Sequence, residues 1–296
     1  MPVNYNKPIS ENPPGASGYD LALEQRDLSY WQDVQVPAQA FMRAIPTGYS
    51  YPPHTRPLTF VETKDQGTIG ACSGFGSTSV AEGVWWVNTG GVKLLFSPWA
   101  QYILNQEADG ITGDRGATGQ GSMKAAKEVG YVPKDMCPPY PDTYADGWSI
   151  TGEMRAAAAP HKIKTFVQLD HIDNAYEEAK KFLQAGLGFI WWLSLWTTRM
   201  DGPGEVVEEF LGPLRQDEHG GGHFTCVLDW TPEDAPTEGL VLLNSWTKEW
   251  GNEGAKVITP KAWNQAAEHK DTILVGVSDL AEPLDPRVVD WDEIDF

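Results

Sequence analysis

Cys72 is the first residue whose surroundings could support nucleophilic chemistry, in the segment DQGTIGACSGF at positions 65–75. A helical pattern begins at this cysteine, so we expect it in the first turn of a helix. Backbone N–H groups point outward there, and the helix dipole favours an anion. Both effects favour the thiolate, the reactive form of cysteine. A cysteine before a helix is more often a small buried hydrophobe, and this segment alone leaves both interpretations open.

A thiolate that attacks a carbonyl needs a hydrogen-bond donor for the developing oxyanion and a partner that moves protons. Gln66, six residues before the cysteine, offers an uncharged side-chain amide for the first task. His223 follows three glycines and begins the apolar segment HFTCVLDW. This pattern predicts a histidine at the edge of a strand, where its ring can face a cleft. Taken alone, His223 would be interpreted as a loop histidine.

Asn244 ends a further apolar segment, LVLLN, 21 residues after His223. Its amide could hold the imidazole of His223 in one tautomer and one orientation, the third role in a catalytic triad. Trp246 follows two residues later and could shield that hydrogen bond from water. The alternative is an Asn-Ser turn beside a tryptophan of the core.

Taken in order, these segments resemble the papain-like cysteine peptidases. The segment around Cys72 is similar to the one in which a glutamine and a glycine precede the family's nucleophile. GGGHFTCVLDW resembles the family's glycine-histidine strand, and NSWTKEWGNEGAKVI resembles its Asn-Ser-Trp segment. His223 lies 151 residues after Cys72, at the upper end of the spacing of about 130–150 expected for such enzymes. The resemblance covers roughly residues 55 to 280 and indicates a divergent member of bacterial or phage type.

The resemblance implies an α+β fold with two lobes. A helical left lobe would carry Cys72, a β-barrel-like right lobe would carry His223 and Asn244, and the active-site cleft would lie between them. It also implies an endopeptidase that works through a thioester acyl-enzyme, with Gln66 and the Cys72 backbone N–H stabilising the oxyanion. A peptide or protein would be the substrate, and neither a cofactor nor a metal is implied. Residues expected to bind substrate are Phe224, Trp246 and Gly121.

The sequence departs from the family at several positions near the site. Ser73 follows the nucleophile where the family has tryptophan. Ile69 stands where the family has a cysteine, so the usual disulfide is absent. Thr247 and Ala255 replace a glycine and a tyrosine of the Asn-Ser-Trp segment. Phe224 replaces a small residue that lines the pocket for the second residue before the cut, which predicts a narrowed or shallow pocket.

Hydrophobic periodicity predicts helices first and strands later, which is typical of an α+β protein with two unlike halves. Gly74 and Gly76 in the first helix suggest close packing or space near Cys72. Ser97 is the expected N-cap of the second helix. Helices are expected at 72–87, 97–105, 122–129 and 174–185, and strands at 162–169, 189–196, 223–230, 240–243, 255–259 and 272–277.

The chain divides into three parts. Residues 1–47, rich in Pro, Asn, Gly and Ser, form an expected N-terminal arm that is too short and too Pro-rich for the family's long helical propeptide. The arm could be a short propeptide, a permanent wrap or a docking arm for an assembly. The peptidase domain is expected at 48–282, with a left lobe at about 55–150 and a right lobe at about 151–282. Residues 283–296 form an acidic tail.

Composition narrows the possible partners and location. With 41 acidic against 22 basic residues, the net charge of −19 would repel phosphate backbones, which disfavours nucleic acid as a partner. No apolar run reaches the ~18 residues needed to cross a bilayer, and no secretory signal is visible. Three cysteines make a poor disulfide framework. We therefore expect no membrane partner and a location in the cytoplasm or within a macromolecular assembly.

Three alternatives remain open. Residues 70–74 also match a nucleophile elbow, and HGGG at 219–222 resembles an esterase oxyanion loop, although here it follows the nucleophile. His219 and His223, with Asp217 and Glu218 nearby, could suggest a metal site, but no helix aligns them. Finally, the chain could be a structural or assembly component of papain-like fold whose catalytic machinery is vestigial or rarely used.

Overall fold

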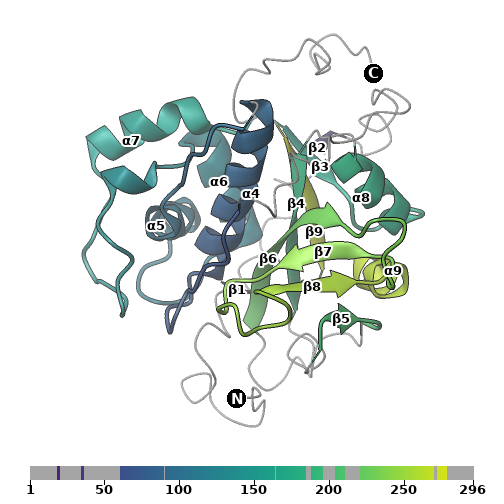
Figure 1. Ribbon diagram of the computed structural model, residues 1–296. Coiled ribbons are helices and arrows are strands. Elements are labelled where there is room, and N and C mark those ends of the chain that lie inside the picture. The colour runs from purple at the N-terminus through teal and green to yellow at the C-terminus, as the bar shows by residue number, and fades with distance from the viewer. Residues whose placement is uncertain are drawn as a thin grey trace.

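The computed structural model describes residues 19–20, 35–36, 61–89, 91–163, 165–184, 188–195, 204–210, 221–269 and 272–278. Helices dominate the first half of these residues and strands the second, which confirms the predicted α+β class. Helices α4 to α7 lie on the left side of Figure 1, and the sheet lies on the right with α8 and α9 beside it. The molecule therefore has the two unlike halves that the change in periodicity indicated.

Among the described residues, four α-helices make up the helical half and two more lie against the sheet, as Figure 1 shows. The first four are α4 (Cys72–Asn88), α5 (Pro98–Asp109), α6 (Gly119–Glu128) and α7 (Gly152–Ala158). The other two are α8 (Ala175–Gln184) and α9 (Pro260–Glu268). Short 3-10 turns occur at Lys134–Met136 and Ala159–His161.

The described strands form one sheet in the order β2-β3-β9-β4-β6-β7-β8-β5, with β1 also pairing with β6. All pairs are antiparallel except β2 with β3 and β5 with β8. The bounds are β1 Tyr19–Asp20, β2 Gln35–Val36, β3 Thr165–Gln168, β4 Gly188–Leu195, β5 Val206–Val207, β6 Gly221–Trp230, β7 Leu240–Leu243, β8 Ala255–Ile258 and β9 Ile273–Ser278.

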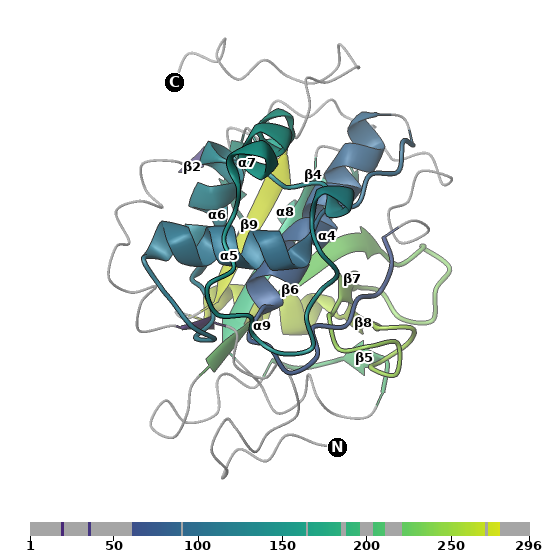
Figure 2. The ribbon, with the colours of Figure 1, turned by 90° about the vertical axis from the view of Figure 1, so that its left-hand side faces the viewer.

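Helix α4 lies between the two halves, with α5 in front of it and the sheet behind it in Figure 2. Two glycines permit this position. A Cβ on Gly74 would come within 2.3 Å of the carbonyl oxygen of Pro98 at the start of α5. A Cβ on Gly76 would come within 2.6 Å of the Phe224 ring on β6. The close packing expected of these glycines is confirmed. It allows the helix that begins at Cys72 to pack closely against the strand that carries His223.

Side-chain caps set the starts of several helices. Ser97 caps α5 as predicted, with its hydroxyl accepting from the N–H of Ala100. Thr118 caps α6, so this helix begins at Gly119, three residues before the predicted start at Ser122. Helices α7 and α9 were not predicted, although each follows a capping threonine. The pair Thr259-Pro260 was the missed signal for α9, because a capping residue followed by proline is typical of a helix start.

Helix α7 belongs to the helical half, and the lobe boundary expected near residue 150 stays a prediction. Ile150 before α7 and Ala158 at its end are buried in one apolar cluster with Trp99 of α5, and Met154 packs against that cluster. This cluster is separate from the larger one that α4 shares with the sheet. The change from helices to strands therefore comes after α7.

Only two short pieces of the N-terminal arm are among the described residues. Tyr19 and Asp20 pair with Gly222 and Gly221 of β6, and Gln35–Val36 pairs in parallel with β3. Both pieces are β-strands. The remaining residues of 1–47 and the tail at 283–296 lie outside the described residues, so the role of the arm stays a prediction. In the part of the chain that the structure describes, no helix combines the length and apolarity needed to span a membrane.

Candidate active site

Cys72 is the first residue of α4 and is fully buried. No side chain caps this helix, because Ala71 occupies the N-cap position. The backbone carbonyl of Ala71 accepts instead from the N–H groups of Gly74 and Phe75. The thiol thus stands where a helix presents backbone N–H groups and the positive end of its dipole, the environment predicted for it.

His223 and Asn244 form a hydrogen bond of 2.7 Å between Nε2 and Oδ1. The oxygen is identified by a second donor, because the backbone N–H of Ser245 also donates to it at 2.7 Å. An amide oxygen can only accept, so Nε2 of His223 must carry the ring proton. The other ring nitrogen, Nδ1, then has the lone pair that can take a proton.

The imidazole of His223 is held in an apolar environment. The Trp246 indole stacks on it with ring centroids 4.3 Å apart and planes inclined by 25°, in the shielding position predicted for that tryptophan. Burial lowers the pKa of His223 to about 4, although the hydrogen bond that the ring donates to Asn244 opposes this shift. The ring is therefore neutral at pH 7 and able to act as a base.

Gln66 is fully buried and joined to the loop that follows Asn244. Its side-chain oxygen accepts from the Ser245 hydroxyl at 2.5 Å, and its backbone N–H donates to the Ser245 carbonyl at 3.0 Å. Its side-chain nitrogen carries two hydrogens and donates to the Ile69 carbonyl at 3.1 Å. Asp65 pairs with Trp246 as an isolated bridge. The segment just before Cys72 is thereby fastened to the segment just after Asn244.

His223 is hydrogen-bonded to Asn244, Gln66 is hydrogen-bonded to the residue after Asn244, and Cys72 begins the helix that packs against the strand of His223. Exposed fractions are 0% for Cys72 and Gln66, 2% for His223 and 4% for Asn244. The arrangement combines a thiol at a helix start, a neutral imidazole with a defined tautomer, and a buried amide donor.

Solved structures with a similar fold are cysteine proteases. Xylellain from Xylella fastidiosa has a TM-score of 0.66 at 17% identity, covering 90% of this chain and 98% of its own. ProCathepsin B S9 from Trypanosoma congolense has a TM-score of 0.56 at 16% identity, covering 80% of each chain. The bromelain protease from Ananas comosus, in complex with the E64 inhibitor, has a TM-score of 0.57 at 14% identity, covering 75% of this chain and 97% of its own.

The fold is papain-like. This confirms the two-lobed architecture that the three motifs implied. No family model matches the sequence, and no curated protein does either. At identities of 14–17%, the likeness concerns the fold and does not extend to the roles of individual residues.

Two predicted substrate-binding residues are buried in this papain-like fold. Phe224 is fully buried, with its ring against Gly76 of α4. Gly121 lies in the first turn of α6, where its N–H donates to the Thr118 hydroxyl, and a Cβ there would meet the carboxylate of Asp109 within 2.4 Å. Each lies beside a packed interface between elements. Their part in binding substrate stays a prediction.

Several residues that support the site were not found from the sequence. The Asn-Ser-Trp segment indicated no role for Ser245, although this serine makes two hydrogen bonds with Gln66. The Tyr140 hydroxyl donates to the Gln66 carbonyl at 2.9 Å, and Asp114 accepts from the N–H of Gly70 at 2.9 Å. Tyr140 and Asp114 lie 74 and 44 residues from their partners, and no periodicity or motif links positions so far apart.

The alternative sites find little support in the described residues. A nucleophile elbow needs a buried strand directly before the cysteine, whereas residues 61–71 contain only the single bridge at Asp65. Among the described residues, no group of His, Cys, Asp and Glu could hold a metal ion. Of the residues considered for a metal site, His223 is hydrogen-bonded to Asn244. The other three, Asp217, Glu218 and His219, lie outside the described residues.

Proposed function

We propose that this protein is a cysteine-type peptidase that hydrolyses peptide bonds through a thioester acyl-enzyme. The observation that carries the proposal is the His223–Asn244 hydrogen bond, which fixes the proton on Nε2 and makes Nδ1 the base. The helix that begins at Cys72 packs against the strand of that histidine. The likeness to solved cysteine proteases supports the same chemistry.

The acylation step uses Cys72, His223 and Gln66. Nδ1 of His223 takes the thiol proton as the sulfur of Cys72 attacks the peptide carbonyl carbon. The carbonyl oxygen becomes an oxyanion, which accepts hydrogen bonds from the side-chain amide of Gln66 and the backbone N–H of Cys72. Collapse of this intermediate breaks the C–N bond, and the leaving amine takes the proton from His223.

Deacylation repeats the cycle with water. His223 takes a proton from water as its oxygen attacks the thioester carbonyl, and the oxyanion again lies against Gln66. The C–S bond then breaks, the carboxylic acid leaves, and Cys72 regains its proton from His223. Asn244 contacts no reacting atom in this scheme. Its role is to keep the imidazole in the orientation and tautomer that both half-reactions require.

Selective alkylation tests the proposal, because the chain has three cysteines in different environments. Burial raises the pKa of Cys226 to about 12 and also raises the pKa of Cys137, so neither thiol forms much thiolate at neutral pH. We expect iodoacetamide or an epoxysuccinyl probe of the E64 type to label Cys72 first, and His223→Ala to abolish this preference. Mass spectrometry of peptides that contain each cysteine gives the rates.

The complete burial of Cys72 and Gln66 favours a second candidate, a structural component of papain-like fold that rarely uses its catalytic machinery. Equal and slow labelling of all three cysteines, unchanged by His223→Ala, would support this alternative and contradict the peptidase. Profiling wild-type protein and Cys72→Ala against a peptide library would then identify any cleavage that depends on the thiol.

A further inference from the structure

We propose that Lys64 is a positioning residue for the oxyanion donor Gln66 and that it acts through an ion pair with Glu82 of α4. This inference rests on the proposed function, because it assigns Lys64 a part in the acylation step. Lys64 precedes Gln66 by two residues, and Glu82 follows Cys72 by ten. The pair therefore joins the segment of the oxyanion donor to the helix of the nucleophile.

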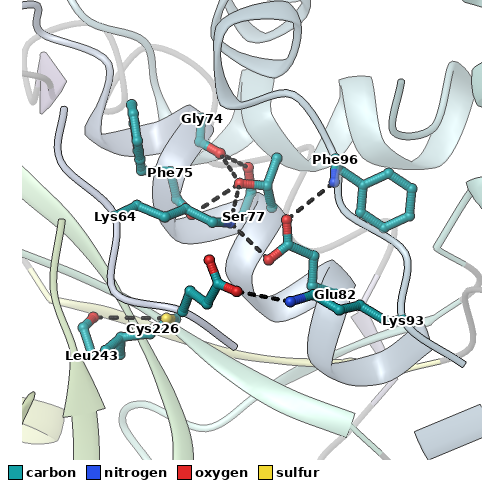
Figure 3. A network of polar contacts seen from close by, with 11 residues as sticks. Lys64, Gly74, Phe75, Ser77, Glu82, Lys93, Phe96, Cys226 and Leu243 are labelled. Atoms are coloured by element: carbon teal, nitrogen blue, oxygen red, sulfur yellow. Dashed lines mark hydrogen bonds and ion pairs between the residues drawn. The ribbon is translucent and has the colours of Figure 1, made fainter. Parts of the chain in front are cut away.

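Glu82 is a fully buried carboxylate with two defined partners. One oxygen accepts from the backbone N–H of Phe96 at 3.1 Å, and the other lies 2.9 Å from the ammonium of Lys64. Figure 3 shows the carboxylate between these two partners, on the helix that also carries Gly74 and Ser77. A buried carboxylate is strongly destabilising unless it is paired. The Lys64 ammonium therefore stabilises the buried charge of Glu82, and this pairing favours the observed position of the lysine.

Lys64 is held by α4 at a second point. Its ammonium donates to the Thr78 hydroxyl at 3.2 Å, and that hydroxyl donates in turn to the Gly74 carbonyl at 2.8 Å. Thr78 and Glu82 are four residues apart and share one face of α4. The Lys64 side chain is 16% exposed. The Lys64 ammonium is therefore fixed to the helix by two contacts, one with Thr78 and one with Glu82.

The other side of the same segment is bound to the sheet half. Asp65 pairs with Trp246, and Gln66 bonds to Ser245 through both its backbone and its side chain. Without Lys64, these contacts would hold Gln66 to the loop after Asn244, and the ion pair with α4 would be lost. Lys64 thus links the segment of Gln66 to the body of α4, in addition to the hydrogen bond between the Gln66 amide and the Ile69 carbonyl just before the helix start.

If Lys64 has this role, its replacement should lower the rates of only those steps that form an oxyanion. An oxyanion donor stabilises the transition state and does not bind the ground state of the substrate, so its displacement lowers kcat with little change in KM. Alkylation by iodoacetamide forms no oxyanion. A displaced Gln66 should therefore slow acylation while leaving alkylation of Cys72 unchanged, whereas general damage to the fold should slow both.

The test compares wild-type protein with Lys64→Met, which keeps the length of the side chain and removes its charge. The acylation rate is the burst of p-nitrophenolate from an N-protected glycine p-nitrophenyl ester, and the alkylation rate is that of Cys72 with iodoacetamide. We expect acylation to fall about 10-fold, a part of the ~10²–10³ attributed to a whole oxyanion donor, and alkylation to stay within about twofold. Gln66→Ala should give the same split with a larger loss.

Lys93→Met is the matched control, because Lys93 forms an exposed ion pair with Glu62 on the same side of the molecule. It should change neither rate. Lys64→Arg keeps the charge and should restore acylation. If Lys64→Met does not fold, the double variant Lys64→Met with Glu82→Gln removes both buried charges and should show the same selective loss.

The outcomes separate the two proposals. Equal acylation in wild type and Lys64→Met, or equal losses of acylation and alkylation in the folded variants, would overturn the positioning role and leave the peptidase proposal standing. Absence of both the burst and the selective alkylation in wild-type protein would overturn the peptidase proposal, and the role of Lys64 with it.

Discussion

At the scale of single residues, the direction of one hydrogen bond decides what His223 can do. Asn244 accepts from Nε2, and the Ser245 N–H keeps the amide from turning over. The stacked indole of Trp246 covers the imidazole. If the amide were reversed, its N–H would donate to Nε2, and the ring proton would lie on Nδ1. Nδ1 would then have no lone pair with which to accept a proton. The residue that orients the imidazole is therefore as informative as the imidazole itself.

Replacing Asn244 with alanine should lower kcat/KM by about 10- to 100-fold, since a freely turning imidazole loses part of the 10²–10⁴ attributed to general acid–base catalysis. Thiol-dependent cleavage of a peptide substrate measures this loss. Asn252→Ala, at an exposed position in the loop after Asn244, should leave the rate unchanged. An unchanged rate in Asn244→Ala would contradict the orienting role.

At the scale of elements, α4 begins at the proposed nucleophile Cys72 and packs on both halves of the molecule. Its valines Val80 and Val84 are buried against the sheet, and Phe75 is buried in the helical cluster. Glycine would ordinarily weaken a helix by about 1 kcal/mol relative to alanine. At Gly74 this weakness is offset by the close approach of α5, which no residue with a Cβ would permit.

Gly74→Ala should therefore destabilise the protein by about 2 kcal/mol despite the better helix propensity of alanine, because overpacking against the Pro98 carbonyl exceeds the propensity gain. Chemical denaturation followed by circular dichroism gives the free energy of unfolding. The control is Gly152→Ala in the first turn of α7, where a Cβ meets no atom within 4 Å. That variant should be neutral or slightly stabilised, and a similar gain in Gly74→Ala would show that α4 and α5 are not in close contact.

At the scale of the whole molecule, the site depends on burial that both halves provide together. His223 ionises near pH 6.5 in a solvated chain but near pH 4 in the folded protein. Between these values the unfolded chain binds a proton that the folded protein does not. Acid therefore favours unfolding, and the stability associated with a neutral His223 is present above about pH 6.5 and lost as the pH falls toward 4.

This difference should reduce the free energy of unfolding by up to about 3 kcal/mol between pH 6.5 and pH 4. Urea denaturation at a series of pH values measures the slope. In His223→Gln, which keeps a side chain able to hydrogen-bond but has no titrating ring, the slope in this range should be smaller by that amount. Equal slopes in both proteins would mean that His223 is solvated and that the two halves do not enclose it.

Local sequence determined much of this protein. The start of α4 at Cys72, the cap at Ser97 and the order of helices and strands followed from periodicity and capping residues, and so did the types of the four candidate site residues. These features depend on neighbours within a few positions, which the sequence displays directly. The papain-like fold was accessible for the same reason, because its motifs are short segments with fixed local chemistry.

Only the tertiary structure decided how those segments support one another. The contact between Ser245 and Gln66 joins positions 179 residues apart, and the Lys64–Glu82 pair, the stacking on His223 and the burial of Cys72 arise likewise from packing between elements. Such contacts depend on how two surfaces meet, and no period or spacing along the chain encodes that. Residue types therefore indicated which chemistry was available, while packing set the tautomer, the pKa and the position of each group.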